Sequence, residues 1–95
     1  MNEINVGEVY YILVRGRGRE RADYFLHSIL PHLPIRVVGN DFEAVIRAAK
    51  IKAGHSLAFA DCFAVALAAA EDASLLTGDP EFKAVESLIE IEWIG

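Results

Sequence analysis

Three carboxylates of the sequence lie in or beside strongly apolar segments. Asp61 is the one charged side chain of residues 57–70, which are otherwise apolar, and Glu8 lies in a second apolar stretch near the N-terminus. Asp79 comes after the short apolar run at residues 74–77. An isolated ionised carboxylate in such surroundings costs several kcal/mol unless a positive group meets it. The three side chains are therefore candidates for a site that holds a cation.

The chemistry of this donor set points to a hard metal ion. We expect the three carboxylates to converge at one edge of a sheet, because ligands of open α/β sheets bind outside the carboxyl ends of the strands. Clustered carboxylates raise one another's pKa unless a cation neutralises them. Oxygen ligands without His or Cys suit Mg²⁺ or Mn²⁺. Such a cluster is what metal-dependent phosphodiester hydrolysis requires, with ions that activate water.

Each carboxylate also has a structural interpretation, which stays open. Asp61 could complement the dipole of a helix capped by Ser56. That effect fades after the first turn of a helix, and Asp61 lies five residues after Ser56. Glu8 and Asn5 have the spacing of a capping box, and Asp79 is a suitable N-cap for the segment that follows it.

Charge is unevenly distributed along the chain. Residues 1–53 carry 8 basic and 6 acidic groups, whereas residues 54–95 carry one basic and 8 acidic groups. The balance excludes a wholly basic nucleic-acid binder, but it fits an acidic site together with a basic strip. That strip, here called the arginine strip, consists of Arg15, Arg17, Arg19 and Arg21. It is either a solvated surface or a set of phosphate contacts, and the carboxylates favour the second interpretation.

The helices and strands that must position these residues can be predicted from the spacing of apolar residues and from the residues that start or end such elements. Helices are expected at residues 3–14, 19–30, 41–53, 57–72 and 80–87, and strands at 34–38, 74–77 and 89–93. This order predicts an α/β fold, a layered α/β/α arrangement with a short parallel sheet. Ninety-five residues allow one domain, 1–95.

Composition places the chain among soluble proteins of the cytoplasm. Its apolar share of 54% excludes intrinsic disorder, and no apolar run reaches the roughly 20 residues of a membrane-spanning helix. There is no positively charged leader at the N-terminus, and the single cysteine cannot form an internal disulfide. We therefore expect no membrane contact.

Three segments of the sequence resemble successive signatures of the PIN-domain family, especially its VapC-type toxins of prokaryotic toxin–antitoxin pairs. The segments are NVGEVYY at residues 5–11, LAFADCFA at 57–64 and LTGDPEF at 76–82. The resemblance implies a PIN-like (5′-nuclease-like) fold and a Mg²⁺- or Mn²⁺-dependent endoribonuclease that cleaves RNA phosphodiester bonds with metal-activated water. It also implies an RNA substrate and an antitoxin protein as partners.

The resemblance implies a role for five residues of this chain. Glu8, Asp61 and Asp79 match the second, third and fourth members of the family's acidic quartet, which are both metal ligands and catalytic residues. Thr77 matches a small hydroxyl residue that supports the site, and Asn5 matches a polar position one turn before the glutamate.

The family's first acidic residue, at the end of its first strand, has no match in this sequence, so an N-terminally truncated PIN-like domain is expected. An alternative function follows, that of a catalytically impaired remnant that serves as a dimerisation or antitoxin-binding module. Because few strands would remain to cover several apolar helices, a homodimer is expected, joined through residues 3–14 or a strand edge.

Overall fold

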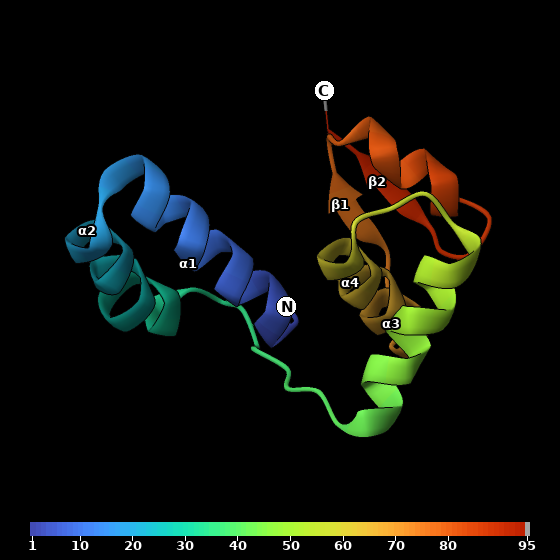
Figure 1. The fold of residues 1–95 in the computed structure, drawn as a ribbon, viewed down its shortest axis with the longest axis horizontal. Helices are drawn as coiled ribbons and strands as arrows, with labels where there is room; N and C mark the ends of the chain where they lie inside the picture. The colour runs from blue at the N-terminus through green and yellow to red at the C-terminus, as the bar shows by residue number, and fades with distance from the viewer. Residues whose placement is uncertain (95) are drawn as a thin grey trace. The chain divides into compact units, whose positions relative to one another are not determined.

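The structure is a computed structural model that describes residues 1–94 and divides into two compact units, Met1–Gly39 and Asn40–Gly95. We call them the N-terminal unit and the C-terminal unit and describe each by itself (Figure 1).

The N-terminal unit is a helical hairpin. It consists of α1 (Glu3–Arg17), α2 (Arg19–Tyr24), the π-helical η1 (Phe25–Ile29) and the 3₁₀-helical η2 (Leu30–His32). Gly18, with φ 89°, makes the turn between α1 and α2 in a backbone conformation that suits glycine. Across the hairpin the Tyr10 hydroxyl donates a hydrogen bond of 2.6 Å to Asp23 Oδ1. The helix predicted over residues 19–30 is thus present, but its second half changes from α to π geometry.

Asn2, not Asn5, caps the first helix. Its side-chain oxygen accepts a hydrogen bond of 2.9 Å from the backbone N–H of Ile4, and α1 begins at Glu3. The proposed capping box of Asn5 and Glu8 is therefore wrong, because Glu8 lies in the second turn of α1, beyond the unpaired N–H groups of the helix start.

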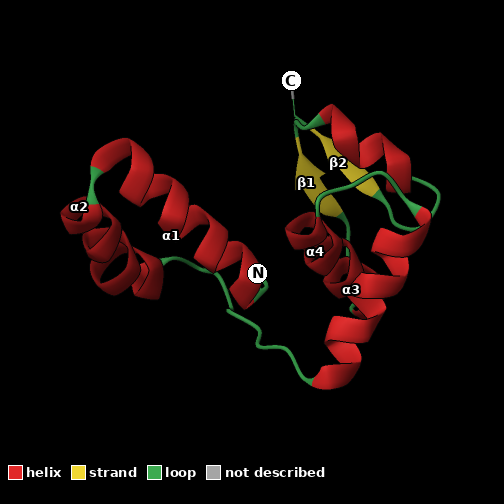
Figure 2. Ribbon diagram, viewed as in Figure 1, coloured by secondary structure: helices red, strands yellow, loops and turns green. Residues whose placement is uncertain are grey.

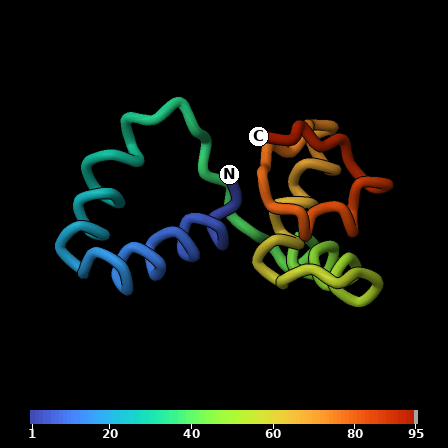
Figure 3. The backbone as a smooth tube through the Cα atoms, turned by 90° about the horizontal axis from the view of Figure 1, so that it is seen from above, coloured from blue at the N-terminus to red at the C-terminus, as the bar shows by residue number. Residues whose placement is uncertain are grey.

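The strand predicted at residues 34–38 is also wrong. Only Val38 forms a ladder contact, a single parallel bridge to Asn2, and residues 34–37 are exposed. The Met1 ammonium group donates to Arg36 O at 2.8 Å, and the Val38 N–H donates to Met1 O at 2.8 Å. Figure 3 shows the N-terminus beside this returning segment. The segment therefore forms an isolated bridge to Asn2 and no strand among the described residues.

The C-terminal unit is an α/β fold with a short parallel sheet. It comprises α3 (Phe42–Gly54), α4 (Phe59–Ala70), β1 (Leu75–Thr77), the 3₁₀ helix η3 (Pro80–Val85) and β2 (Ile91–Trp93). β1 and β2 pair in parallel with Leu75 opposite Ile91 and Thr77 opposite Trp93 (Figure 2). The predicted parallel sheet is confirmed, although among the described residues it has two strands instead of three.

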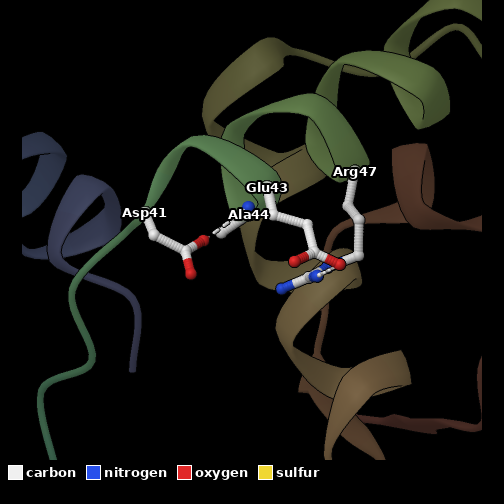
Figure 4. Close-up of polar contacts among 4 residues, drawn as sticks. All are labelled: Asp41, Glu43, Ala44 and Arg47. Carbon is white, nitrogen blue, oxygen red and sulfur yellow. Dashed lines mark hydrogen bonds and ion pairs between the residues drawn. The ribbon is translucent and has the colours of Figure 1, made fainter.

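Asp41 caps α3 as its sequence position predicts. Its Oδ1 accepts a hydrogen bond of 2.8 Å from the Ala44 N–H, and one turn further on Arg47 pairs with Glu43 at 3.3 Å (Figure 4). The ion pair is exposed and separated by four residues, so it adds only a few tenths of a kcal/mol to helix stability. The cap is the stronger of the two, at about 1 kcal/mol.

The helix α4 starts later than predicted, with Ala58 as its N-cap in place of Ser56. Tertiary packing explains the later start. Leu57 is only 3% exposed and packs into the core, so the backbone stays non-helical up to and including this residue. α3 and α4 are bent by 115° at this connection.

The core of the C-terminal unit lies between α3, α4 and the sheet. Its fully or nearly fully buried members are Ala48, Leu57, Cys62, Phe63, Val65, Ala68, Phe82, Val85 and Ile89. One face of β1 packs on this core through Leu75, whereas Leu76 on the other face is 65% exposed. On α3, Val45 packs on the core, whereas Phe42 is 80% exposed.

No single helix among the described residues is long and apolar enough to cross a membrane. α3 and α4 together would meet that test by length and composition, but they are sharply bent against each other and α4 is largely buried in the core.

Candidate metal centre

Three acidic side chains of the C-terminal unit meet at the carboxyl end of β1. One oxygen each of Asp61, Asp79 and Glu81 lies within 4.8 Å of the other two, and we call these residues the acidic cluster. Asp61 comes from α4, whereas Asp79 and Glu81 come from the start of η3. Two of the three were predicted from the sequence. Glu81 was missed, although its position two residues after Asp79 was a usable signal.

Asp61 lies in the first turn of α4, as its third residue, and its side chain is half-buried. Because the helix starts later than predicted, the helix-dipole interpretation of Asp61 is stronger than the sequence analysis suggested. The positive end of the helix stabilises a carboxylate at a surface position there by about 0.3–1 kcal/mol. The same field lowers the cost of holding Asp61 ionised near two other carboxylates.

Asp79 is held by hydrogen bonds on both sides. Its Oδ1 accepts from the Glu81 N–H at 2.9 Å, which makes it the N-cap of η3, and its own N–H donates to Thr77 Oγ1 at 3.1 Å. A carboxylate offers about four acceptor positions, so one capping bond leaves Asp79 able to bind a cation. Thr77, predicted as a supporting residue, thus contacts the backbone of Asp79.

Gly78, between Thr77 and Asp79, lets β1 end close to β2. A Cβ atom at Gly78 would lie 3.3 Å from the backbone oxygen of Ile94, tighter than most real Cβ contacts. Thr77 is the last residue of β1 that pairs with β2. Glycine at position 78 therefore allows the backbone to turn toward Asp79 and the acidic cluster directly after Thr77.

The acidic cluster fits a divalent ion of the Mg²⁺ class. Two carboxylates about 4–5 Å apart repel each other by roughly 1 kcal/mol in water, and more where water is partly excluded. A cation between them converts this repulsion into attraction. Asp79 and Glu81 are exposed, so the position is open to solvent, and all the donor atoms are carboxylate oxygens.

The histidines and the cysteine add no metal ligand to this cluster. His55 has a ring nitrogen 2.9 Å from the Ile51 carbonyl oxygen, at the end of α3. Cys62 is fully buried, and this burial raises the pKa of its thiol. It behaves as a small core residue, as its alanine-rich context predicts.

Glu8 and Asn5 lie on α1 in the N-terminal unit, one turn apart on the same helix, and both are half-buried. Because Asn2 caps α1, the capping-box interpretation of Glu8 no longer applies. The convergence of Glu8 with Asp61 and Asp79 stays a prediction, because they belong to different units.

The arginine strip surrounds the turn between α1 and α2, and its four side chains are exposed. Arg15 lies over the ring of Tyr11, with its guanidinium carbon 5.2 Å from the ring centre. The other three arginines line an open groove whose apolar members include Leu13 and Phe25. A surface of this kind offers both guanidinium groups and flat apolar faces.

A family model described as "PIN domain" matches residues 1–88. Among solved structures, the chain resembles one entitled "Crystal structure of DNA bound VapBC from Salmonella typhimurium", with a TM-score of 0.74 and 22% identity over 96% of this chain and 71% of that chain. At this identity the likeness is one of fold, and it confirms the predicted PIN-like architecture. No curated protein matches in sequence. Because the family model covers nearly the whole sequence, the chain belongs to the PIN-domain family.

Proposed function

We propose that this chain is a Mg²⁺- or Mn²⁺-dependent endoribonuclease, the toxin of a toxin–antitoxin pair. The observation that carries the proposal is the acidic cluster, because three carboxylates of one compact unit gather where a PIN-domain protein needs cation ligands. The likeness to a VapBC structure supports the toxin–antitoxin context, and RNA cleavage in the cytoplasm accords with it.

In this proposal Asp61, Asp79 and Glu81 hold the ion, with Glu8 as a further ligand and Asn5 beside it. A bound divalent ion supplies Lewis acidity, which makes water a better nucleophile and stabilises the departing oxygen of a phosphodiester. The protein's own contribution is to fix the carboxylates. Thr77 holds the backbone of Asp79, and the first turn of α4 holds Asp61.

The arginine strip is proposed to bind the RNA substrate. Guanidinium groups match phosphate oxygens in pairs, and the groove they line also presents apolar faces suited to unstacked bases. An antitoxin protein is the second proposed partner. The printed title of the similar structure describes a DNA-bound VapBC assembly, and a cognate antitoxin for this chain is proposed by analogy with it.

The test is a cleavage assay on single-stranded RNA with EDTA, Mg²⁺ or Mn²⁺. We expect cleavage that requires the metal, is lost in Asp79→Asn and is retained in Glu86→Gln. The control removes an exposed carboxylate of the same unit that lies outside the acidic cluster. Activity that survives in EDTA, or that Asp79→Asn leaves unchanged, would refute the proposal.

One observation favours a second candidate function, a module that works by association. β1 has one neighbouring strand among the described residues, and the exposed Leu76 and Ile94 lie at the same sheet. An unprotected strand edge with apolar side chains invites pairing with another chain. A homodimer is therefore proposed, and sedimentation equilibrium at micromolar concentration tests it. A sharply melting monomer without nuclease activity would contradict both functions.

A further inference from the structure

The position of Asp61 depends on how α4 begins, and α4 begins without a side-chain cap. Its N-cap residue is Ala58, whose side chain can accept no hydrogen bond from the first turn. The Cys62 N–H donates to Ala58 O at 3.2 Å, and just before the helix the Leu57 N–H donates to His55 O at 3.1 Å. The non-helical residues before α4 therefore bear on the direction of its first turn.

Lys52, near the end of α3, binds one of these residues. Its Nζ donates a hydrogen bond of 2.8 Å to the backbone carbonyl of Leu57, five residues further along the chain. The bond is partly buried, and a charged donor makes it stronger than an ordinary hydrogen bond to a carbonyl. Lys52 thus spans the connection between α3 and α4, from the last turn of α3 to the residue that precedes the N-cap of α4.

Leu57 is fixed from its other side by the core. Its side chain is 3% exposed among the core residues, and the Sγ atom of Cys62 lies 4.0 Å from the same carbonyl oxygen that Lys52 binds. The peptide of Leu57 is thereby held between a buried side chain and a charged hydrogen bond. Asp61 follows Leu57 by four residues. The orientation of the Leu57 peptide therefore sets the direction in which the first turn of α4 points the Asp61 carboxylate.

We propose that Lys52 is a positioning residue for the metal centre: through Leu57 O it orients the first turn of α4, and with it the Asp61 carboxylate. The inference rests on the proposed function, since it assigns a role toward the ion that the acidic cluster would hold. Residues that orient metal ligands without touching the metal change metal affinity by about 10- to 100-fold when mutated.

The sign of the effect separates positioning from simple electrostatics. Lys52 is a cation in the same unit as a proposed cation site. Removing its charge alone would favour the binding of Mn²⁺, because like charges repel. Loss of positioning acts in the opposite direction, since Asp61 would no longer be held in a binding orientation. A weaker Mn²⁺ affinity in a lysine-to-neutral variant therefore cannot come from the charge.

The experiment compares Lys52→Met with Lys50→Met. Lys50 lies on the same helix, is exposed, and gives the same charge change without contacting the Leu57 carbonyl. Mn²⁺ affinity is measured by the loss of the free-ion EPR signal, well below the melting temperature of each variant. Amide hydrogen exchange at Cys62, whose N–H closes the first turn of α4 on Ala58 O, is followed in the absence of metal. Lys52→Arg serves as the conservative replacement.

We expect Lys52→Met to weaken Mn²⁺ binding about tenfold and to speed exchange in the first turn of α4, with Lys52→Arg restoring part of both. Lys50→Met should bind as the wild type does or slightly more tightly. Equal affinities in the two methionine variants, or unchanged exchange at Cys62, would overturn the inference. If the wild type binds no Mn²⁺, the proposed function fails, and the exchange rates alone decide whether Lys52 orders this turn.

Discussion

Replacing Asp61 by Asn should change the stability of the protein in opposite directions with and without metal. In the absence of a cation, Asp61 faces Asp79 and Glu81 with oxygen atoms within 4.8 Å. Each of the two repulsions costs roughly 1 kcal/mol in water at such distances. The substitution removes both repulsions but gives up the favourable helix-dipole interaction in the first turn of α4, about 0.3–1 kcal/mol. The net expectation is a gain of about 1 kcal/mol.

For a domain of this size, a gain of 1 kcal/mol raises the melting temperature by about 4–8 °C. Bound metal reverses the order of the two melting temperatures. An ion at a hundred times its Kd stabilises the wild type by about 2.7 kcal/mol, and the variant gains less because it has lost one charged ligand. The wild type should then melt at the higher temperature.

The assay is differential scanning calorimetry of both proteins in EDTA and in millimolar Mn²⁺. Low ionic strength keeps the repulsion measurable, since the Debye length is about 10 Å at 0.1 M salt. Glu86→Gln is the control, an exposed carboxylate outside the acidic cluster whose removal should leave the response to Mn²⁺ unchanged. If Asp61→Asn melts below the wild type in EDTA, or if Mn²⁺ stabilises both proteins equally, the reasoning about the acidic cluster is refuted.

Three further predictions concern other parts of the chain. The hydrogen bond that the Tyr10 hydroxyl donates to Asp23 raises the pKa of Tyr10 above its ordinary value, so the stability that this bond contributes is complete below about pH 10 and is lost as the pH rises through the folded-state pKa. Thermal melts between pH 8 and 12 should show this alkaline loss in the wild type and a flatter curve in Tyr10→Phe. Asp72 adopts φ 51° after the end of α4, where glycine is less strained. Asp72→Gly should therefore stabilise the protein by about 0.5–1 kcal/mol in urea unfolding, and an unchanged or lower midpoint would contradict this. Conversion of the arginine strip to glutamine should weaken RNA binding across sequences and flatten its salt dependence, whereas an unchanged salt slope would leave the strip as plain surface.

Elements with strong local signals were predictable from the sequence. Asp41 caps α3 as expected, the apolar run before Asp79 forms β1, and Asp79 itself starts the next helix. The two aspartates act on backbone groups within a few residues and the strand is a short apolar run, so the information lies in the local sequence. The α/β class and the parallel pairing of the two C-terminal strands follow from the order of these elements.

The errors arose where a distant contact decides the local structure. Ser56 has the chemistry of an N-cap, but burial of Leu57 delays the start of α4 to Phe59. Residues 34–38 have strand-like composition, yet among the described residues they pair only through the bridge between Val38 and Asn2. Tertiary packing overrides propensity in both places.

The candidate site was predictable in part. Apolar surroundings and position after a strand drew attention to Asp61 and Asp79, whereas Glu81 is marked in the sequence only by its spacing of two residues from Asp79. Its place in the acidic cluster comes from η3, which turns the residue back toward α4.

Anomalous scattering from crystals grown with Mn²⁺ tests metal binding by the acidic cluster most directly. We expect a peak within coordination distance, about 2.0–2.3 Å, of carboxylate oxygens of Asp61, Asp79 and Glu81, with Mg²⁺ competing for the same position. Glu86→Gln crystals should keep the peak and Asp79→Asn crystals should lose it. A Mn²⁺ peak elsewhere in the molecule, with none at the acidic cluster, would contradict the proposed metal centre.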